Sequence, residues 1–427
     1  MQEYKAKSKA ELLQIKEELE KCYAQSKTEG LALNMARGNP AKEQLALSMK
    51  MLDVVNEQTM LLTEDGVDCR NYGGLEGIPE AKKLIADMLE VDTSNVLVGG
   101  NSSLNLMYNA IAKAVTHGIL GETAWCKCDT VKFLCPVPGY DRHFAITEHF
   151  GVEMITIPMN EEGPDMDLVE KLVNEDKAVK GIWCVPKYSN PQGITYSDNT
   201  VKRFAKLKPA AKDFRLYWDN AYAEHHLYAN KHDELLNILE ECTKNGNEDM
   251  PYIFCSTSKI SFPGSGIAAM VTSTNNIQDM LKTFMIQTIG PDKINQLRHA
   301  KFFGNIETLR EHMCKHADII RPKFEMVFRI LKEELSDLGI GEWRTPNGGY
   351  FISFSTLPGC AKEVIARASA AGLVMTGAGA TYPYGKDPED KNIRIAPTFP
   401  DIEELEKAVR LFVLCVKIVS IEKLLEA

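Results

Sequence analysis

The sequence predicts an α/β protein: a large domain with a mostly parallel seven-stranded sheet between helices, plus a smaller α+β domain. Its 427 residues exceed the roughly 250–300 residues at which single cores stop growing. Between about 81 and 300, short apolar and β-branched runs alternate with helical segments, a pattern typical of sheets covered on both faces. Residues 350–427 follow a strand, helix, strand, helix pattern, which predicts the smaller domain.

The individual elements follow from local periodicity. Residues 8–28 place apolar side chains at helical spacing between Lys and Glu, which predicts an amphipathic surface helix ending near Gly30. A continuous helical pattern covers 295–336. The predicted strands of the large sheet are 95–98, 131–135, 153–157, 181–185, 214–218, 252–255 and 268–272. In the last part, we expect strands at 350–354 and 392–396 and helices at 361–371 and 402–420.

Charge and cysteine content exclude several classes of protein. Lys and Arg number 49 against 59 Asp and Glu, and no run of five basic residues occurs, so nucleic acid and anionic membranes are not expected partners. The eleven cysteines are scattered, which indicates reduced thiols rather than a disulfide framework. Cys126 and Cys128 lack a second pair at zinc-site spacing, so no metal is expected. Without an apolar leader or an 18-residue apolar run, we expect a cytoplasmic protein.

Polar residues follow the predicted strand 95–98, at the position where ligands bind in open α/β sheets. Gly100, Asn101 and Ser102 stand there, ahead of a helical pattern. The free amides and dipole of a helix N-terminus favour a phosphate. The same residues also fit an ordinary N-cap turn.

Two further strand ends carry chemically active side chains. Asp219 and Tyr222 follow strand 214–218, where a carboxylate and a phenol are costly unless they are paired. Ser256 and Lys259 follow strand 252–255, ahead of a loop containing Gly and Pro. A lysine held inward there would have a lowered pKa and could serve as an amine nucleophile, although a lysine after a strand usually lies on the surface.

Six motifs in order and spacing resemble those of the fold-type-I, class I aminotransferases, which use pyridoxal 5′-phosphate (PLP). The resemblance covers about 34–415 and is closest to a bacterial subgroup of aspartate aminotransferases that begins with Met-Ala-Arg-Gly-Asn-Pro (35–40). It implies a homodimer, a large PLP-binding domain at 60–310, and a small domain formed by 1–59 with 311–427. The motifs are Asn-Tyr-Gly-Gly-Leu-Glu-Gly-Ile-Pro-Glu (71–80), Gly-Gly-Asn-Ser-Ser (99–103), Asn-Pro-Gln-Gly (190–193), Asp-Asn-Ala-Tyr (219–222), Ser-Thr-Ser-Lys (256–259) and Asn-Ile-Arg-Ile-Ala (392–396).

The resemblance implies roles in holding and using the PLP ring. Lys259 would bond covalently to PLP and, once freed by substrate, would move a proton between the substrate α-carbon and C4′ of the cofactor. Asp219 would pair with the protonated pyridine nitrogen, which keeps the ring able to accept electrons. Asn190 and Tyr222 would donate hydrogen bonds to the 3′-oxygen, and Tyr140 would stack on the ring. The catalytic residues would then be Lys259, Asp219 and Tyr222.

The resemblance also implies a phosphate site and a substrate site. Gly100, Asn101, Ser102 and Ser256 would hold the phosphate, and Tyr72 would reach it from the neighbouring subunit. Arg394 would bind the substrate α-carboxylate through a bidentate fork. Asn190 would lie beside the substrate, and Gly38 lies in the segment that would cover it.

The sequence does not determine which cations would bind the phosphate and the side-chain carboxylate of a substrate. The family usually places an arginine seven or eight residues after the lysine, but this chain has Ser265-Gly266-Ile267 there. Lys187, Arg37 or a cation from the partner subunit could replace it, or neutral donors could suffice. For a dicarboxylic substrate, the side-chain carboxylate would need its own cation. The segment 293–299, with Lys293 and Arg298, is the first candidate and Arg37 the second, and both also fit ordinary surface charge.

The function expected is transfer of the amino group of an L-amino acid, aspartate or glutamate, to a 2-oxo acid such as 2-oxoglutarate by a ping-pong mechanism. An aromatic or alanine aminotransferase, a β-lyase or a decarboxylase would use the same fold and lysine, because the cofactor sets the carbanion chemistry. A distant alternative is the sensor domain of a transcription regulator. That class needs an added basic module of several dozen residues, whereas only about 30 residues precede the resemblance.

Overall fold

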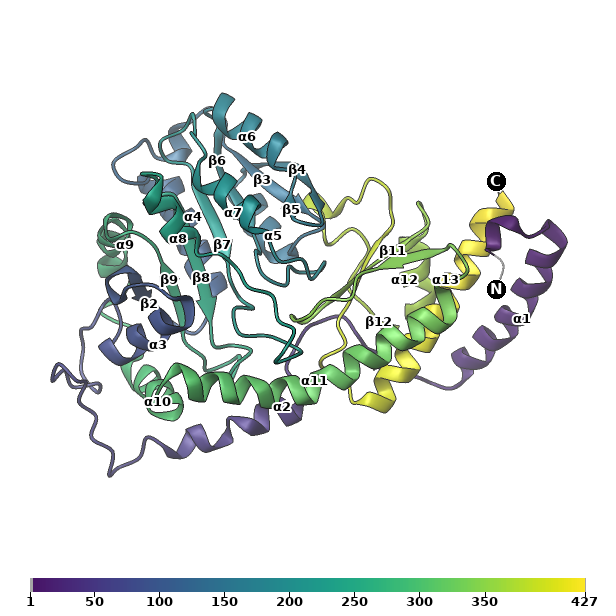
Figure 1. The fold of residues 1–427 in the computed structure, drawn as a ribbon, viewed down its shortest axis with the longest axis horizontal. Helices are drawn as coiled ribbons and strands as arrows, with labels where there is room; N and C mark the ends of the chain where they lie inside the picture. Colours follow the sequence, from purple (N-terminus) through teal and green to yellow (C-terminus); the bar gives the residue numbers. More distant parts are fainter. Residues whose placement is uncertain (1–2, 427) are drawn as a thin grey trace.

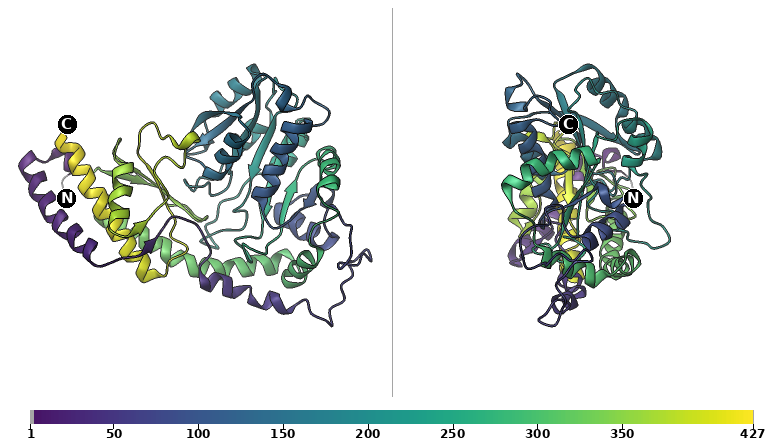
Figure 2. Two further views of the ribbon diagram at one scale, coloured as in Figure 1. Left: turned by 180° about the vertical axis from the view of Figure 1, so that it is seen from behind. Right: turned by 90° about the vertical axis from the view of Figure 1, so that its left-hand side faces the viewer.

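The computed structural model describes residues 3–426 and consists of two lobes (Figure 1). The larger lobe contains an eight-stranded sheet in the order β2-β9-β8-β7-β6-β3-β4-β5. The smaller lobe contains a three-stranded sheet, β10-β11-β13, and the strand pair β1-β12. Both ends of the described chain lie in the smaller lobe, where the first and last helices pack side by side (Figures 1 and 2). The fold is α/β with a smaller α+β lobe, as the sequence predicts.

All seven predicted strands belong to the large sheet. The sheet has eight strands, however, so the predicted number of seven is too low by one. The added strand, β5, pairs antiparallel with the end of β4 at the sheet edge. It has only two residues, one of them Pro164, so it carries no alternating pattern that the sequence could reveal. The bounds are β2 Val96–Val98, β3 Lys132–Val137, β4 Glu153–Asn160, β5 Gly163–Pro164, β6 Val179–Cys184, β7 Arg215–Asp219, β8 Pro251–Ser256 and β9 Ala268–Val271.

The strand directions place six carboxyl ends, those of β2, β3, β4, β6, β7 and β8, at one edge of the large sheet. β3 pairs parallel with β4 and β6, and β7 pairs parallel with β6 and β8. β9 runs antiparallel to both β8 and β2, so β2 points the same way as β8. The segments after β2, β3, β4, β6, β7 and β8 therefore begin at the same edge, which is the usual place for a ligand in such sheets.

Helices cover both faces of the large sheet. Leu106 of α4, Phe144 of α5 and Ile277 of α9 belong to the core on one face. Leu84 of α3 and Val201 of α7 belong to the core on the other face, together with residues of α6, α8 and α10. The bounds are α3 Pro79–Leu89, α4 Ser103–His117, α5 Asp141–His149, α6 Met166–Glu175, α7 Asp198–Ala205, α8 Ile238–Lys244, α9 Thr274–Gln287 and α10 Lys293–Phe303.

The helical pattern predicted over 295–336 is two helices rather than one. α10 ends at Gly304, whose φ of +69° is a backbone conformation that glycine adopts readily. The Asn305 side chain then accepts a hydrogen bond from the Thr308 amide at 2.9 Å and caps α11 (Ile306–Leu335). Helical periodicity continues through this break, because one glycine does not change the spacing of apolar residues.

The smaller lobe is built from both ends of the chain. Its core joins Leu12, Val327, Phe354, Val364 and Phe412, which lie far apart in sequence. α11 runs beneath both lobes and connects them (Figure 1), while the division at 60–310 stays a prediction. The remaining elements are α1 Lys9–Thr28, β1 Leu33–Asn34, α2 Lys42–Leu47, β10 Gly341–Trp343, β11 Ile352–Thr356, α12 Ala361–Ala370, β12 Leu373–Val374, β13 Asn392–Ile395 and α13 Ile402–Glu426.

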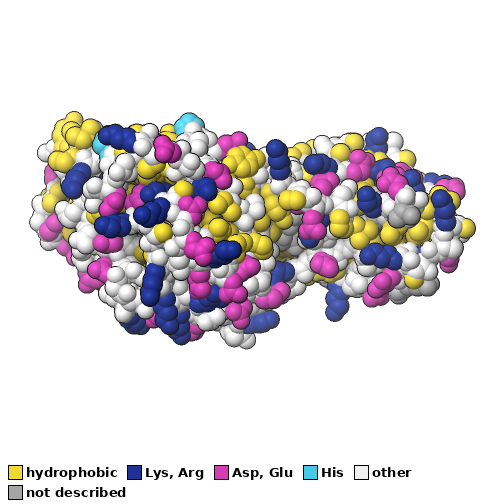
Figure 3. Space-filling view, turned by 90° about the horizontal axis from the view of Figure 1, so that it is seen from above, with side chains coloured by type: hydrophobic (Ala, Val, Ile, Leu, Met, Phe, Trp, Pro, Cys, Tyr) yellow, Lys and Arg dark blue, Asp and Glu magenta, His cyan; other side chains and the backbone are white. Residues whose placement is uncertain are grey.

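The surface carries mixed charge. Figure 3 shows acidic and basic side chains interspersed over the face that it draws, on both lobes. Among residues 3–426, no helix is long and apolar enough to cross a membrane.

Candidate active site

A cleft of about 360 Å³ lies where the carboxyl edge of the large sheet meets the smaller lobe. The structure brings most of the predicted site residues together here, from both lobes. Those that line the cleft are Gly38, Ser102, Tyr140, Asn190, Asp219, Tyr222, Ser256, Lys259 and Arg394. Gly100, Asn101 and Tyr72 are not among the lining residues.

Asp219, the last residue of β7, presents a carboxylate with one oxygen engaged and one free. His143 Nε2 lies 3.0 Å from Asp219 Oδ2, and the Trp183 ring stacks on the His143 ring with centroids 4.4 Å apart. Asp219 Oδ1 is buried without a hydrogen-bond partner among residues 3–426. Because such an atom costs free energy, the carboxylate is suited to accept a hydrogen bond from a ligand.

Lys259 follows β8 and stands between two aromatic rings. Its Nζ lies 5.3 Å from the ring centroid of Tyr222 and 5.9 Å from that of Tyr350. Burial lowers the pKa of Lys259, and the Asp219 carboxylate opposes this shift. A lower pKa increases the neutral fraction of the amine, which is the nucleophilic form.

The two tyrosines of the cleft are phenols, not phenolates, at neutral pH. Burial raises the pKa of Tyr140 to about 12, with a smaller contribution from the charge of Asp219. Burial also raises the pKa of Tyr222 well above its usual value. Both side chains therefore keep an O–H group that can donate a hydrogen bond to a ligand.

Arg394 reaches the cleft from β13 of the smaller lobe. Its Nη1 donates to Asp141 Oδ1 at 3.0 Å and to Asn190 Oδ1 at 3.3 Å, and its Nη2 donates to Thr376 Oγ1 at 3.2 Å. The guanidinium also lies over the Phe351 ring, 4.8 Å from the centroid. Its Nε is buried without a partner among residues 3–426. These contacts hold the Arg394 guanidinium in place, and its Nε–H group remains available to donate a hydrogen bond.

The start of α4 and the segment after β8 form a small cradle of hydroxyl groups. Ser102 caps α4, and Ser256 Oγ donates to Ser258 Oγ at 3.1 Å. Asn101 instead donates from Nδ2 to the Gly264 carbonyl at 3.3 Å, and Gly100 lines a separate hollow. The side chains of Ser102, Ser256 and Ser258 line the cleft.

The structure separates the candidate cations. Arg37 lines the cleft, and so does Arg142, which the sequence reasoning did not single out. Lys187 lines a different cavity. Lys293 is buried, and its Nζ donates to the Asn71 and Gly73 carbonyls. Arg298 donates to Ser265 Oγ at 2.6 Å and is not among the residues that line the cleft.

Sequence reasoning missed His143, Asp141, Thr376 and Phe351. His143 lies three residues after Tyr140 at the start of α5, and this helical spacing was an available signal. Thr376 and Phe351 carry no such signal, because packing between the lobes brings them to the cleft. Among residues 3–426, no group of three His, Cys, Asp or Glu side chains could hold a metal ion.

Comparison with known proteins agrees with this geometry. A sequence profile of the family described as aspartate amino-transferase matches residues 7–427. The chain belongs to the aspartate aminotransferase family. It is 44% identical over 407 residues to an aspartate aminotransferase of Corynebacterium glutamicum, covering 95% of this chain and 94% of that one. The aminotransferase also superimposes on a C. glutamicum aspartate transaminase crystal structure with a TM-score of 0.96 at 42% identity, covering 99% of each chain.

A more distant structure shares only the fold. The α-aminoadipate aminotransferase of Thermus thermophilus, solved with N-(5′-phosphopyridoxyl)-L-leucine, has a TM-score of 0.74 at 19% identity, covering 93% of this chain and 95% of that one. The fold is therefore that of the fold-type-I, class I aminotransferases. The family implies PLP as cofactor.

The residues of this aminotransferase fit PLP. The buried, unpartnered Asp219 Oδ1 suits a protonated ring nitrogen. The hydroxyl groups at the start of α4 suit a phosphate, and the Lys259 amine stands in the same cleft. The chemistry of the cleft therefore suits each part of PLP: the carboxylate suits the ring nitrogen, the hydroxyl groups suit the phosphate, and the amine suits the aldehyde.

Proposed function

We propose that this aminotransferase uses PLP to move the amino group of L-aspartate or L-glutamate to a 2-oxo acid such as 2-oxoglutarate. The observation that carries the proposal is one cleft lined by Lys259, the half-paired Asp219 and Arg394. The enzyme would release the first 2-oxo acid before it binds the second, which is a ping-pong order.

The chain's residues divide the work around the cofactor. PLP, when bound, supplies a ring that accepts the electron pair of the broken α C–H bond. Asp219 would keep the ring nitrogen protonated, and Asn190 and Tyr222 would donate hydrogen bonds to the 3′-oxygen. Tyr140 would lie against the ring. Lys259 would hold the cofactor covalently and then carry the proton to and from the α-carbon.

The phosphate would lie against hydroxyl groups and main-chain amides. Ser102 and Ser256 line the cleft, and Gly100 and Asn101 would contribute through the main-chain amides just ahead of α4. The charge of the missing arginine would be supplied by Arg37 or Arg142, since both line the cleft. Lys187 does not suit this role because it lines another cavity.

Substrate binding would exchange one carboxylate for another at Arg394. Asp141 already occupies Nη1 at 3.0 Å, so an incoming α-carboxylate would compete with it for the fork. Asn190 would stay beside the substrate. A Cβ at Gly38 would stand 2.6 Å from the Phe351 ring, so a larger residue there would disturb the segment that covers the cleft.

Two observations support a preference for a dicarboxylic substrate: the arginines that line the cleft and the similarity to an aspartate aminotransferase. Arg37 and Arg142 line the cleft in addition to Arg394, so a cation remains for the second carboxylate. The C. glutamicum relative at 44% identity is named an aspartate aminotransferase. An aromatic or alanine preference stays the alternative, because the shared fold does not determine the substrate. The family favours transamination over β-elimination and decarboxylation.

The working form would be a cytoplasmic homodimer. Met285 and Ile286 in the last turn of α9 and Ile289 just after it expose 64%, 85% and 63% of their surfaces, and Tyr72 exposes 80%. Exposed apolar surface of this kind is typical of interfaces. Tyr72 would then enter the partner subunit's cleft. All eleven cysteines are free in the structure, in keeping with a reducing compartment.

Single-turnover spectroscopy tests this function. Purified enzyme with PLP should absorb in the visible range, and aspartate or glutamate should bleach the band within one half-reaction and release the 2-oxo acid. Lys259→Ala should abolish both the band and the reaction, while Lys231→Ala, at an exposed lysine, should keep them. A response to alanine or an aromatic amino acid without one to aspartate or glutamate would refute the substrate assignment.

A further inference from the structure

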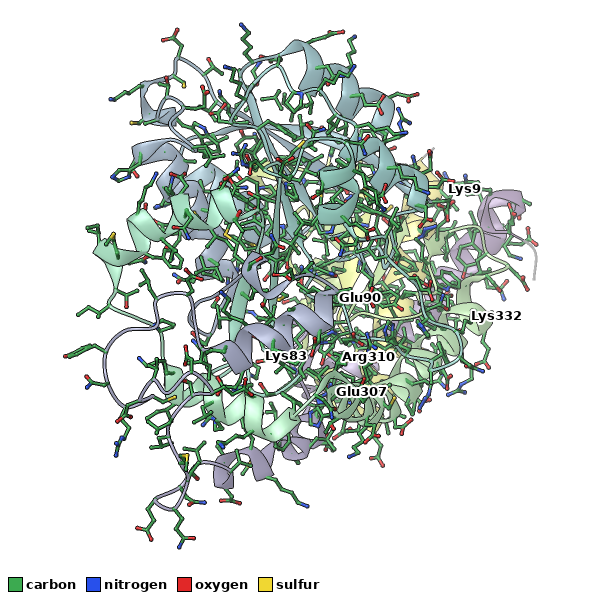
Figure 4. The ribbon with its side chains drawn as sticks, turned by 60° about the vertical axis from the view of Figure 1, so that its left-hand side comes forward. Lys9, Lys83, Glu90, Glu307, Arg310 and Lys332 are labelled. Atoms are coloured by element: carbon green, nitrogen blue, oxygen red, sulfur yellow. The ribbon has the colours of Figure 1, made fainter. Side chains whose placement is uncertain are left out.

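A second and larger cavity, of about 640 Å³, lies on the other side of the strand-end segments that form the cleft. Its walls come from the end of α3, the segment from Asn220 to Ile238, and α11. Figure 4 labels Glu90 and Arg310, both lining residues, on the neighbouring α3 and α11 sides of its rim. Sites for small molecules usually have volumes of about 300–1,000 Å³, so the cavity is large enough for one.

The cavity and the cleft share a segment but not side chains. Asp219 and Tyr222 line the cleft, whereas Asn220, Ala223 and Glu224 line the cavity. From Trp218 to Ala221 successive residues line the cavity and the cleft in turn, and beyond them the chain turns, so that Tyr222 lines the cleft while Ala223 and Glu224 line the cavity. A ligand in the cavity would therefore lie apart from the groups that bind the cofactor.

Lys187 is the cation of this cavity that lacks a carboxylate. Its Nζ donates to the Ala223 carbonyl at 2.9 Å, and it forms no ion pair among residues 3–426. Burial lowers the pKa of Lys187, and the charges of Glu224 and Asp233 oppose this shift without an ion pair to its Nζ. A carboxylate could occupy its remaining donors.

Most of the other charged groups of the cavity have partners, whereas the Glu90 and Glu234 carboxylates at its edge form no ion pair among residues 3–426. Arg310 Nη2 lies 3.2 Å from Glu224 Oε1, Arg321 pairs with Asp318, and Asp233 accepts from Asn347 Nδ2 at 2.8 Å. Burial and the nearby Lys187 lower the pKa of His226 to about 3, so this histidine is neutral. Lys187 is thus the strongest anchor that the described residues offer to an anion here.

Asn220 adds an unsatisfied acceptor to the same cavity. Its Oδ1 is buried without a hydrogen-bond partner among residues 3–426, which favours a ligand that donates an N–H or O–H group. The cavity also has an apolar side, with Trp218, Leu235 and Met313 among its lining residues. Lys187, Asn220 Oδ1 and the apolar wall together favour a small molecule that has a carboxylate, a hydrogen-bond donor and an apolar group.

We propose that this cavity is a second ligand site, which binds a small carboxylate carrying an N–H donor and an apolar side chain, as an amino acid or an N-acylated amino acid does. The carboxylate meets Lys187, the N–H group donates to Asn220 Oδ1, and the side chain packs on the apolar wall. This site goes beyond transamination, because none of these contacts involves Lys259 or Arg394.

N-acetyl-L-leucine is a suitable probe, because its acylated nitrogen cannot take part in transamination. Titration of the PLP-loaded enzyme by isothermal calorimetry should show saturable binding of one molecule per chain. N-acetyl-L-leucinamide, which lacks the carboxylate, should bind at least about tenfold more weakly. Lys187→Met and Asn220→Leu should each weaken the probe by a similar factor, while Lys187→Arg, which keeps the cation, should retain more of the binding.

Two controls separate this site from the cleft and from misfolding. Arg394→Lys should leave the affinity for the probe unchanged, because Arg394 lines the cleft and not the second cavity. Each variant should keep the thermal unfolding midpoint of the parent enzyme. If Asn220→Leu unfolds at a lower temperature, Asn220→Ala takes its place, because it also removes the acceptor. The proposal is overturned if binding is not saturable, if Lys187→Met and Lys187→Arg bind as the parent does, or if only Arg394→Lys loses binding. None of these readouts requires turnover.

Discussion

His143 Nε2 lies 3.0 Å from Oδ2 of Asp219, and the other carboxylate oxygen of Asp219 is buried without a partner among residues 3–426. One side of the carboxylate is therefore held by the protein, and the other is presented to the cleft. The stacked Trp183 ring holds the histidine in turn. This arrangement orients a negative charge before any ligand binds, which reduces the cost of organising the site.

Replacing Asp219 with asparagine should leave a folded protein that binds PLP but turns over slowly. In the proposed mechanism, the ring nitrogen would lose its protonated state without the carboxylate, and the ring would accept electrons less well. We expect kcat to fall by about 100-fold or more, equivalent to ~2.7 kcal/mol of transition-state stabilisation. Steady-state kinetics at saturating PLP measures this. His143→Gln, which keeps a hydrogen-bonding side chain, should fall less, and full activity in Asp219→Asn would refute the electron-sink role.

Replacing Arg394 with lysine should weaken substrate binding more than catalysis. Lysine keeps the charge but not the planar fork that meets a carboxylate through two hydrogen bonds. We expect KM for the amino acid to rise about tenfold to 100-fold, which corresponds to ~1.4–2.7 kcal/mol, with a smaller change in kcat. Asp141→Asn is the matched variant: it removes the carboxylate that competes for Arg394, so its KM should fall or stay level. A parallel rise in both variants would contradict this competition.

Replacing Ile286 with aspartate should break the proposed dimer. Ile286 exposes 85% of its surface beside the exposed Met285 and Ile289, and a buried, unpaired charge at an interface is strongly unfavourable. Sedimentation velocity should show the parent chain as a dimer and Ile286→Asp as a monomer with weakened PLP retention. Leu13→Asp, at an exposed residue of α1, is the control. A monomeric parent chain would overturn the assignment.

The unfolding free energy should fall between pH 6.5 and pH 4 because of buried histidines. Burial lowers the pKa of His299 to about 4 and of His316 to about 3, against about 6.5 in an unfolded chain. The unfolded state therefore binds more protons over this range, so its free energy falls relative to the folded state. Each histidine should contribute a loss of about 2 kcal/mol at pH 5 relative to neutral pH.

Urea unfolding of the PLP-free chain at pH 7.5 and pH 5 measures this dependence. His299→Gln should reduce the pH-dependent loss, because glutamine does not titrate. His117→Gln, at an exposed histidine, should leave it unchanged. An identical loss in the parent and His299→Gln would show that this histidine does not contribute.

Much of the fold could be predicted because it depends on local pattern. Runs such as 252–255 and 268–272 are short, apolar and bounded by turn residues, which is typical of buried strands, and parallel strands end at one sheet edge. Asp219 and Lys259 were therefore found at the cleft from their positions after such runs. β5 and the break at Gly304 were not predicted, because a two-residue strand and a single glycine leave the apolar spacing unchanged.

The sequence by itself determined the alternation of strands and helices and the strand-end positions of Asp219 and Lys259, since these follow from side-chain chemistry and periodicity along the chain. Only the tertiary structure decided which cations share the cleft. Arg37 and Arg142 line it, whereas Lys187 lines the second cavity and Lys293 binds main-chain carbonyls. The physical reason is that a side chain's surroundings depend on packing between segments far apart in sequence, which no local pattern records.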